Sequence, residues 1–263
     1  MADELNARQR TSHLIDKSIE RIGTLFDGPK QDRSRQRITQ IFDAATKIFA
    51  RDGISAARIA DIAAEASVMP ASIYDYFKSK EDLAYSIPVT RQLDFFIEYR
   101  DQSQSLHTAR ERLDHFLWLS ADFVFRNAEW ARVFYLEIWP SVHIEKREIQ
   151  PIFDDYAHIV ICLLREGEES GEWPVQADIH TTANILIGSV NQTIITWLLY
   201  RQPRNLRQAT RVLLQWLIGF VCSQHPAATT SPLTLIRKSN MTRNSQGGAT
   251  STNTAAPTNS SDA

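Results

Sequence analysis

The chain has 263 residues, of which 43% are hydrophobic, and it contains only 9 glycines and 10 prolines. This composition favours packed helices in one large domain or two modest ones. The formal net charge of −2 excludes an argument for nucleic-acid binding from overall basicity, so that function requires a local site. Because no signal peptide and no run of about 18 apolar residues is found, we expect a cytoplasmic protein without a membrane segment.

Residues 1–34 are predicted to be a polar, partly helical extension of the fold. A weakly periodic helix runs roughly from Leu5 to Phe26, and the Asp27-Gly28-Pro29 turn ends it.

Residues 35–95 are predicted to form a compact domain built on three helices. Apolar residues recur at helical spacing until Gly53 stops the first helix, and they are Ile38, Ile41, Phe42, Ala45, Ile48 and Phe49. Two shorter helices are predicted at about 58–66 and 70–76. Neither is long enough to be stable alone, so we expect them to pack against each other and against the first helix.

Longer amphipathic helices are predicted after Lys80, and no alternation typical of strands competes with them. We place these helices near 80–104, 108–126, 128–138, 146–168, 178–200 and 205–223. Residues 96–224 are therefore expected to form a second helical domain, and the fold class is predicted to be all-α. From about His225 the composition shifts to Ser, Thr, Asn, Ala and Pro, which predicts that residues 225–263 are a disordered tail.

The stretch from Ile59 to Leu83 carries the strongest functional signal. Its first helix has an apolar face with small alanines, Ser67-Val68 supplies a short turn, and Pro70 suits the first position of the next helix. Two helices joined by such a turn form the arrangement that places the second helix in the major groove of DNA. If Ile73 and Phe77 face inward, the exposed side of this second helix holds Met69, Ala71, Ser72, Tyr74, Asp75 and Tyr76.

At these positions the sequence resembles the TetR family of bacterial transcriptional regulators. The matching residues are Ile62, Ala63, Ala66, Val68, Ser72, Ile73, Tyr74, Tyr76, Phe77, Lys80 and Leu83, with Gly53 also in its expected place. The resemblance implies an N-terminal helix-turn-helix domain for operator DNA and a C-terminal helical domain for ligand binding and dimerisation. It also implies that Tyr74 and Lys80 contact phosphates. The predicted DNA-binding residues are Arg58, Met69, Pro70, Ala71, Ser72, Tyr74, Asp75, Tyr76, Lys78 and Lys80.

The sequence departs from the family pattern at three points. Ala57 replaces a frequent helix-capping Thr, which leaves Ser55 or Arg58 as candidates for that cap. Ser67 replaces the usual turn Gly, so either Ser67 takes a strained conformation or the turn changes type. Met69 and Pro70 replace the usual Ser and a frequent Lys or Arg of the family pattern, so one helix cap and one positive charge are missing here. The basic residues before the first helix either add DNA contacts or are an ordinary solvated helix start, and they are Arg33, Arg35 and Arg37.

Aromatic residues concentrate between Phe95 and Tyr156, where the resemblance implies a cavity for a small apolar or aromatic effector. The predicted effector-binding residues are Phe95, Tyr99, Phe116, Phe134, Trp139, His158 and Asn191. Each aromatic residue in this group could instead belong to the ordinary core. Asp154 and His158 share a helix face, but two ligands without a third do not predict a metal site.

The last two long helices are apolar on more than one side. A second apolar flank has no core of its own to face, so it predicts a homodimer in which these helices pair with their copies. The predicted interface residues are Ile185, Ile195, Leu199, Leu214 and Leu217. The family resemblance supports this interface, and the alternative is one large intramolecular core.

We expect neither catalysis nor a cofactor, because the chain lacks a phosphate-binding glycine loop and the common hydrolase and metalloprotease motifs. The predicted function is a repressor released from its operator by a small effector. The alternative is an adaptor that kept the fold and lost operator binding. Pro88 predicts a kink or break near Ala84–Ile87 that is either a signalling hinge or a passive feature of packing.

Overall fold

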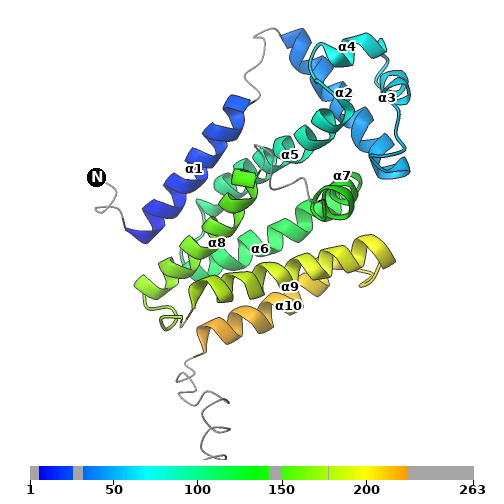
Figure 1. The fold of residues 1–263 in the computed structure, drawn as a ribbon. Helices are drawn as coiled ribbons and strands as arrows, with labels where there is room; N and C mark the ends of the chain where they lie inside the picture. The colour runs from blue at the N-terminus through cyan, green and yellow to red at the C-terminus, as the bar shows by residue number, and fades with distance from the viewer. Residues whose placement is uncertain (1–5, 26–31, 142–149, 177, 224–263) are drawn as a thin grey trace, which may run out of the picture. The chain divides into compact units, whose positions relative to one another are not determined.

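The computed structural model describes residues 6–25, 32–141, 150–176 and 178–223, and every regular element within them is helical (Figure 1). The predicted all-α fold is therefore confirmed. The elements are α1 (Ala7–Leu25), α2 (Asp32–Asp52), α3 (Ile59–Glu65), α4 (Pro70–Tyr74), α5 (Lys80–Ser103), α6 (Ala109–Arg126), α7 (Ala128–Arg132), the π-helix η2 (Val133–Ile138), α8 (Gln150–Glu169), α9 (Ile179–Tyr200) and α10 (Leu206–Cys222). Within the described ranges, no helix combines the length with the hydropathy that a bilayer crossing requires. The predicted tail, 225–263, lies outside the described residues.

The helices α2, α3 and α4 form the predicted three-helix unit. Helix α2 packs against α3, and α3 packs against α4. Phe77, just after α4, packs against Phe42 of α2 with ring centroids 5.4 Å apart. Gly53 ends α2 with a φ of +79°, a left-handed conformation that a residue with a Cβ adopts only with strain.

Helix α5 connects this unit to the remaining helices. It crosses residue 95, so the two predicted domains share one helix. It also continues across Pro88, so of the kink or break predicted near Ala84–Ile87, the break is absent. Proline removes only one helical hydrogen bond, and Ile87, Pro88 and Val89 are all buried, so packing holds the helix together at this point.

Helix α6 lies at the centre of the second part of the fold, where it packs against α5, α7, α8, α9 and α10. The single helix predicted at 128–138 is instead α7 followed by the π-helix η2, whose wider turns bond each N–H to the carbonyl five residues earlier. Trp139 N–H donates to Phe134 O at 2.8 Å in this way. Periodicity in the sequence does not reveal such a change of helix type.

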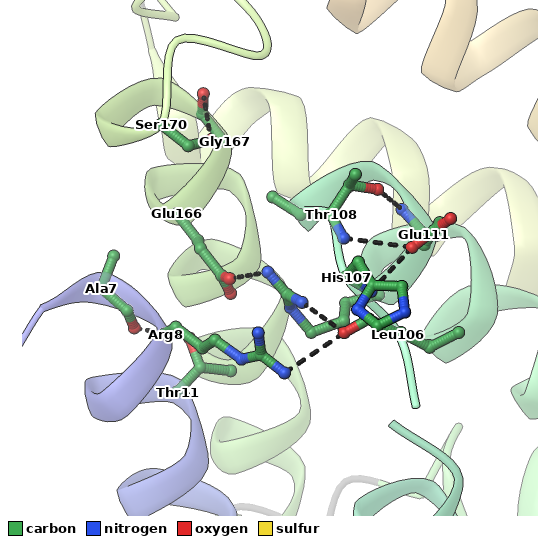
Figure 2. A network of polar contacts seen from close by, with 12 residues as sticks. Ala7, Arg8, Thr11, Leu106, His107, Thr108, Glu111, Glu166, Gly167 and Ser170 are labelled. Carbon is green, nitrogen blue, oxygen red and sulfur yellow. Dashed lines mark hydrogen bonds and ion pairs between the residues drawn. The ribbon is translucent and has the colours of Figure 1, made fainter. Parts of the chain in front are cut away.

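Helix α1 packs against α8 and α5 rather than against the three-helix unit (Figure 1). Ile15 and Ile22 on its inner face are buried. Arg21 forms an ion pair with the buried carboxylate of Asp155, and Arg8 donates to Leu106 O at 3.2 Å (Figure 2). The predicted N-terminal extension thus belongs to the body formed by the C-terminal helices.

A buried ion pair links α6 to α8. The side chains of Arg112 and Glu166 are 8% and 5% exposed, and Arg112 also donates to Leu106 O at 2.9 Å (Figure 2). The thiols of Cys162 and Cys222 are free, and both residues are half-buried.

Candidate functional site: a DNA-binding face and an effector cavity

The turn between α3 and α4 sets the direction of the predicted recognition helix. Ser67 adopts a left-handed conformation with a φ of 54°, which confirms the strained alternative predicted for the missing glycine. Val68 N–H then donates to Ala63 O at 2.9 Å and closes the turn. Pro70 occupies the first turn of α4, where its missing N–H breaks no helical hydrogen bond.

The structure exposes most of the residues predicted to read DNA. Met69 and Tyr74 are 72% and 57% exposed. On the same face, four further residues are exposed, namely Pro70, Ala71, Asp75 and Lys78. Ser72 and Tyr76 are half-buried. Ile73 and Phe77 are buried, as predicted for the inner face of the second helix.

Lys80 has an intramolecular role that the sequence did not indicate. Its ammonium donates to Ser55 O at 2.8 Å and to Ala57 O at 3.0 Å, and so holds the segment that leads into α3. Arg58 at the N-cap of α3 provides no side-chain cap and instead forms an ion pair with Asp61. Of the two candidate caps, Arg58 therefore provides none, and Lys80 instead holds the backbone carbonyls of Ser55 and Ala57 just before α3.

The start of α5 also uses its polar groups internally. Ser79 accepts a hydrogen bond from Asp82 N–H at 3.1 Å, and the Asp82 carboxylate accepts one from Lys78 N–H at 2.9 Å. Two backbone donors that could otherwise meet a phosphate are thus already bonded. The side chains of Arg33 and Arg35 lie outside the described part of the molecule, and Arg37 is exposed.

A cavity of about 210 Å³ lies among the C-terminal helices. Helices α5, α6, α7, η2, α8 and α9 all contribute to its wall. The lining residues are Gln92, Phe95, Ser120, Phe123, Val124, Trp130, Phe134, Tyr135, Trp139, Tyr156, Ala157, Asn184, Ile187 and Asn191. Half of these 14 lining residues are aromatic, and none of the 14 carries a formal charge.

The cavity includes four of the seven predicted effector-binding residues, namely Phe95, Phe134, Trp139 and Asn191. Tyr99 and Phe116 do not line it, because their rings pack edge to face at 4.8 Å in the core between α5 and α6. His158 does not line it either. It lies on α8 two residues beyond Tyr156, which turns its side chain to the solvent.

Two pairs of polar side chains in the cavity wall bond to each other. The Tyr156 hydroxyl lies 2.7 Å from Ser120 Oγ, and the Tyr135 hydroxyl donates to Asn191 Oδ1 at 3.3 Å. Burial raises the pKa of Tyr156 to about 12, although the hydrogen bond with Ser120 opposes the shift. Burial also raises the pKa of Tyr135. Both phenols are therefore neutral at physiological pH.

Two further polar groups in the wall have no hydrogen-bond partner among the described residues, namely Gln92 Nε2 and Trp130 Nε1. Both atoms are buried. Trp130 is not among the predicted effector-binding residues, because an aromatic side chain at this position fits the hydrophobic core equally well. No local pattern marks Gln92, because the neighbouring residues Arg91 and Asp94 are also polar.

An apolar surface extends over α9 and α10. Trp216 and Phe220 are 77% and 68% exposed, and Ile185, Leu199 and Val212 are also exposed. Of the other predicted interface residues, Ile195 and Leu217 are half-buried. Leu214 is fully buried in the chain's own core, so it does not belong to this surface. Trp216 lies two residues after Leu214 on α10, so its side chain points to the opposite side of the helix.

Family models match both the DNA-binding helices and the helices that surround the cavity. Residues 41–87 match the family model of bacterial regulatory proteins of the tetR family, and residues 89–219 match that of the C-terminal region of YsiA-like protein. The fatty acid metabolism regulator protein of Bacillus subtilis is 28% identical over 192 residues, which are 71% of this chain and 96% of that protein. The transcriptional repressor KstR2 of Rhodococcus jostii is 24% identical over 161 residues, 60% of this chain and 79% of that protein.

Solved structures agree with this assignment. The crystal structure of the transcriptional regulator FadR from Bacillus subtilis in complex with stearoyl-CoA is 26% identical, with a TM-score of 0.64, and the match covers 68% of this chain and 97% of that one. Helix α1 precedes the residues that the family models match. These relatives are regulators and not enzymes, which confirms the prediction that the chain has no catalytic activity. The chain therefore belongs to the TetR family, and it is a DNA-binding transcriptional regulator with an N-terminal helix-turn-helix and a C-terminal helical ligand-binding domain.

Proposed function

We propose that this regulator represses transcription as a cytoplasmic homodimer and leaves its operator when a long-chain acyl-CoA fills the cavity. The observation that carries this proposal is the cavity wall, which is aromatic and free of formal charge among its described residues. Such a wall favours an apolar chain, because burial of apolar surface is the main favourable term when a ligand enters it.

The relatives support this class of effector. The Bacillus subtilis structure holds stearoyl-CoA, and the Bacillus subtilis relative is a fatty acid metabolism regulator protein. In the present chain, Trp139 lines the cavity and is 44% exposed, so one part of the wall reaches the molecular surface. We propose that the acyl chain lies inside and that the polar CoA group remains on the solvent side.

For DNA binding, we propose that α4 enters the major groove and that Tyr74 contacts a phosphate. Its ring is exposed beside the small residues at the start of α4, which allow the backbone to approach the bases closely. Met69, Asp75 and Lys78 are exposed on the same segment and are the further proposed contacts. Lys80 supports this surface through Ser55 and Ala57, and one of its three N–H donors is available for a phosphate.

For assembly, we propose that the apolar surface of α9 and α10 pairs with the same surface of a second copy. Helices α9 and α10 pack against each other, and both expose large apolar side chains, which is typical of a protein interface. These side chains are Trp216, Phe220, Ile185 and Leu199. Gly188 on α9 has open space around its Cβ position, so a partner helix can approach closely there. The two recognition helices would then read half-sites about 34–36 Å apart, or a helical multiple of that spacing.

Fluorescence anisotropy on DNA from the protein's own upstream region tests the proposal. We expect operator binding that palmitoyl-CoA reverses and that CoA alone does not. Operator binding that no acyl-CoA reverses would exclude this effector class. If the protein binds acyl-CoA but binds none of a set of promoter fragments, the adaptor function is supported instead.

A further inference from the structure

We infer that helix α1 braces α5 against α8 across one joint of the cavity wall and so limits the length of the acyl chain that the cavity accepts. This inference rests on the proposed role of the cavity as the acyl-CoA site. It adds an element that decides which acyl chains bind, and that element precedes the residues that the family models match.

The first observation is the position of α1 against two helices of the cavity wall. Helix α5 supplies Gln92 and Phe95 to the wall, and α8 supplies Tyr156 and Ala157. Both helices pack extensively on α1, and they pack on each other far less. Inside the wall, the rings of Phe95 and Tyr156 meet across this joint with centroids 6.0 Å apart. Outside the wall, α1 bridges the joint.

The second observation is that α1 is anchored near both of its ends. Near the start, Arg8 donates to Leu106 O at 3.2 Å (Figure 2). Near the end, Arg21 forms an ion pair with Asp155 of α8, whose side chain is 7% exposed. Ile22, the next residue along α1, is fully buried. Separation of α5 from α8 would disturb these contacts, so α1 opposes it.

The third observation is the size of the cavity. An apolar cavity of about 150 Å³ accommodates benzene, so the 210 Å³ available here accommodates roughly eight carbon atoms. The acyl chain of palmitoyl-CoA has about twice as many. Burial of the remaining methylene groups is favourable, so a long chain favours a wider cavity over leaving half of its length in water. We place this widening at the joint between α5 and α8, because these two wall helices pack on each other so little.

The brace therefore affects long and short chains differently. The work of moving α5 away from α8 against α1 reduces the affinity for a long chain, and a chain that fits the cavity without widening avoids this work. Loosening α1 should then strengthen the binding of palmitoyl-CoA and leave the binding of octanoyl-CoA nearly unchanged. A helix that only stabilised the fold would not distinguish the two ligands.

Isothermal titration calorimetry on the DNA-free protein, with octanoyl-CoA and palmitoyl-CoA, tests this inference. Ile22→Ala removes buried packing between α1 and the wall helices without a change of charge. We expect palmitoyl-CoA to bind this variant about 10-fold more tightly than it binds the wild type, with octanoyl-CoA unchanged to within about 2-fold. Arg21→Met loosens α1 by removing the cation that pairs with Asp155, and it should act in the same direction.

Two control variants separate the brace from general destabilisation. Ile218→Ala is the same change on α10, at a side chain that is 1% exposed and does not line the cavity. Arg10→Met removes an ion pair between α1 and Glu169 of α8 in which the side chains are 39% and 49% exposed, and such pairs contribute little. Both controls should keep the wild-type ratio of the two affinities. Thermal melts followed by circular dichroism confirm that each variant is folded.

The inference is wrong if Ile22→Ala and Arg21→Met keep the wild-type ratio, if octanoyl-CoA gains as much affinity as palmitoyl-CoA, or if Ile218→Ala shifts the ratio equally. These results are distinct from failure of the proposed function. An unchanged ratio combined with normal operator release by palmitoyl-CoA would overturn the brace alone. The expected shift without operator release by any acyl-CoA would overturn the repressor mechanism alone, and no binding of either ligand would overturn both.

Discussion

The Glu137 carboxylate accepts a hydrogen bond from the backbone N–H of Ile54, with Oε2 3.4 Å from the nitrogen. Glu137 belongs to η2, whose neighbouring residues Phe134 and Tyr135 line the cavity. Ile54 lies in the turn directly after α2, the helix on which α3 packs. The Cβ position of Gly53 is only 3.6 Å from the same carboxylate oxygens. This contact therefore joins the wall of the effector cavity to the DNA-binding unit.

Glu137→Ala should weaken the coupling between effector and operator. We expect a ligand against Phe134 and Tyr135 to shift η2, and without the carboxylate that shift would reach the end of α2 less directly. We expect a smaller ratio between operator affinities measured without and with palmitoyl-CoA, and unchanged palmitoyl-CoA binding to the free protein. Fluorescence anisotropy and calorimetry provide the two measurements. Glu137→Gln, which retains an acceptor oxygen, should keep most of the wild-type ratio.

Pro88→Ala tests the other route, through α5. Because α5 is continuous and Pro88 is buried, we expect this variant to keep the wild-type ratio of operator affinities. If Pro88→Ala lowers the ratio while effector binding persists, and Glu137→Ala does not, then α5 carries the signal. The contact between Glu137 and Ile54 would then be structural only.

Tyr74→Phe should weaken binding to all DNA sequences by a similar factor. The change removes only a hydroxyl. A hydrogen bond to a charged phosphate contributes about 1.5–3 kcal/mol, and the proposed dimer loses two of them, so a loss of roughly 100-fold to 10,000-fold is expected. Operator and random DNA should lose affinity in the same proportion. Loss confined to the operator would show that Tyr74 reads bases.

Lys80→Ala should affect both the salt dependence of DNA binding and the stability of the DNA-binding unit. If the ammonium also meets a phosphate, the slope of log affinity against log salt falls by about one unit for each subunit, and so by about two units for the proposed dimer. Because Lys80 holds the carbonyls of Ser55 and Ala57, the melting temperature should fall as well. A lower melting temperature with an unchanged slope would assign Lys80 to structure alone.

Trp216→Asp combined with Phe220→Asp should produce monomers that no longer bind the operator. Both side chains are exposed on α10, so the folded monomer tolerates the changes while the paired surface does not. Light scattering at micromolar concentration measures the mass. Val175→Asp is the control, because Val175 is exposed in the loop before α9. Leu214→Asp should unfold the protein instead, since that side chain is fully buried. A double variant that remains dimeric would place the interface elsewhere.

Arg112→Met should destabilise the protein by about 3–5 kcal/mol, because it leaves the Glu166 carboxylate buried without its cation. Chemical denaturation measures the loss. The double variant with Glu166→Leu should recover much of the stability, since it removes the unpaired charge. Arg58→Met is the control, because the Arg58–Asp61 pair is solvent-exposed and surface pairs contribute little. Equal losses for the Arg112 and Arg58 variants would contradict this explanation.

The sequence alone determined the all-α fold, the family and the bounds of most helices to within a few residues. Helical periodicity and capping are local properties, so α9 and α10 could be placed at 178–200 and 205–223 without any knowledge of their neighbours. The helix-turn-helix was recognisable for the same reason. Its residues lie close together in the chain, and their spacing directly reflects their arrangement in space.

Only the tertiary structure decided which side chains form the sites. Phe95 and Phe116 are indistinguishable as aromatic residues on amphipathic helices, yet the crossing of α5 and α6 places the first in the cavity wall and keeps the second in the core. The same holds for Leu214 and Trp216, and for the internal bonds of Lys80. The packing of α1 on α8 likewise joins segments far apart in the chain. Such outcomes depend on the relative rotation of helices that are distant in sequence, and no local pattern encodes that rotation.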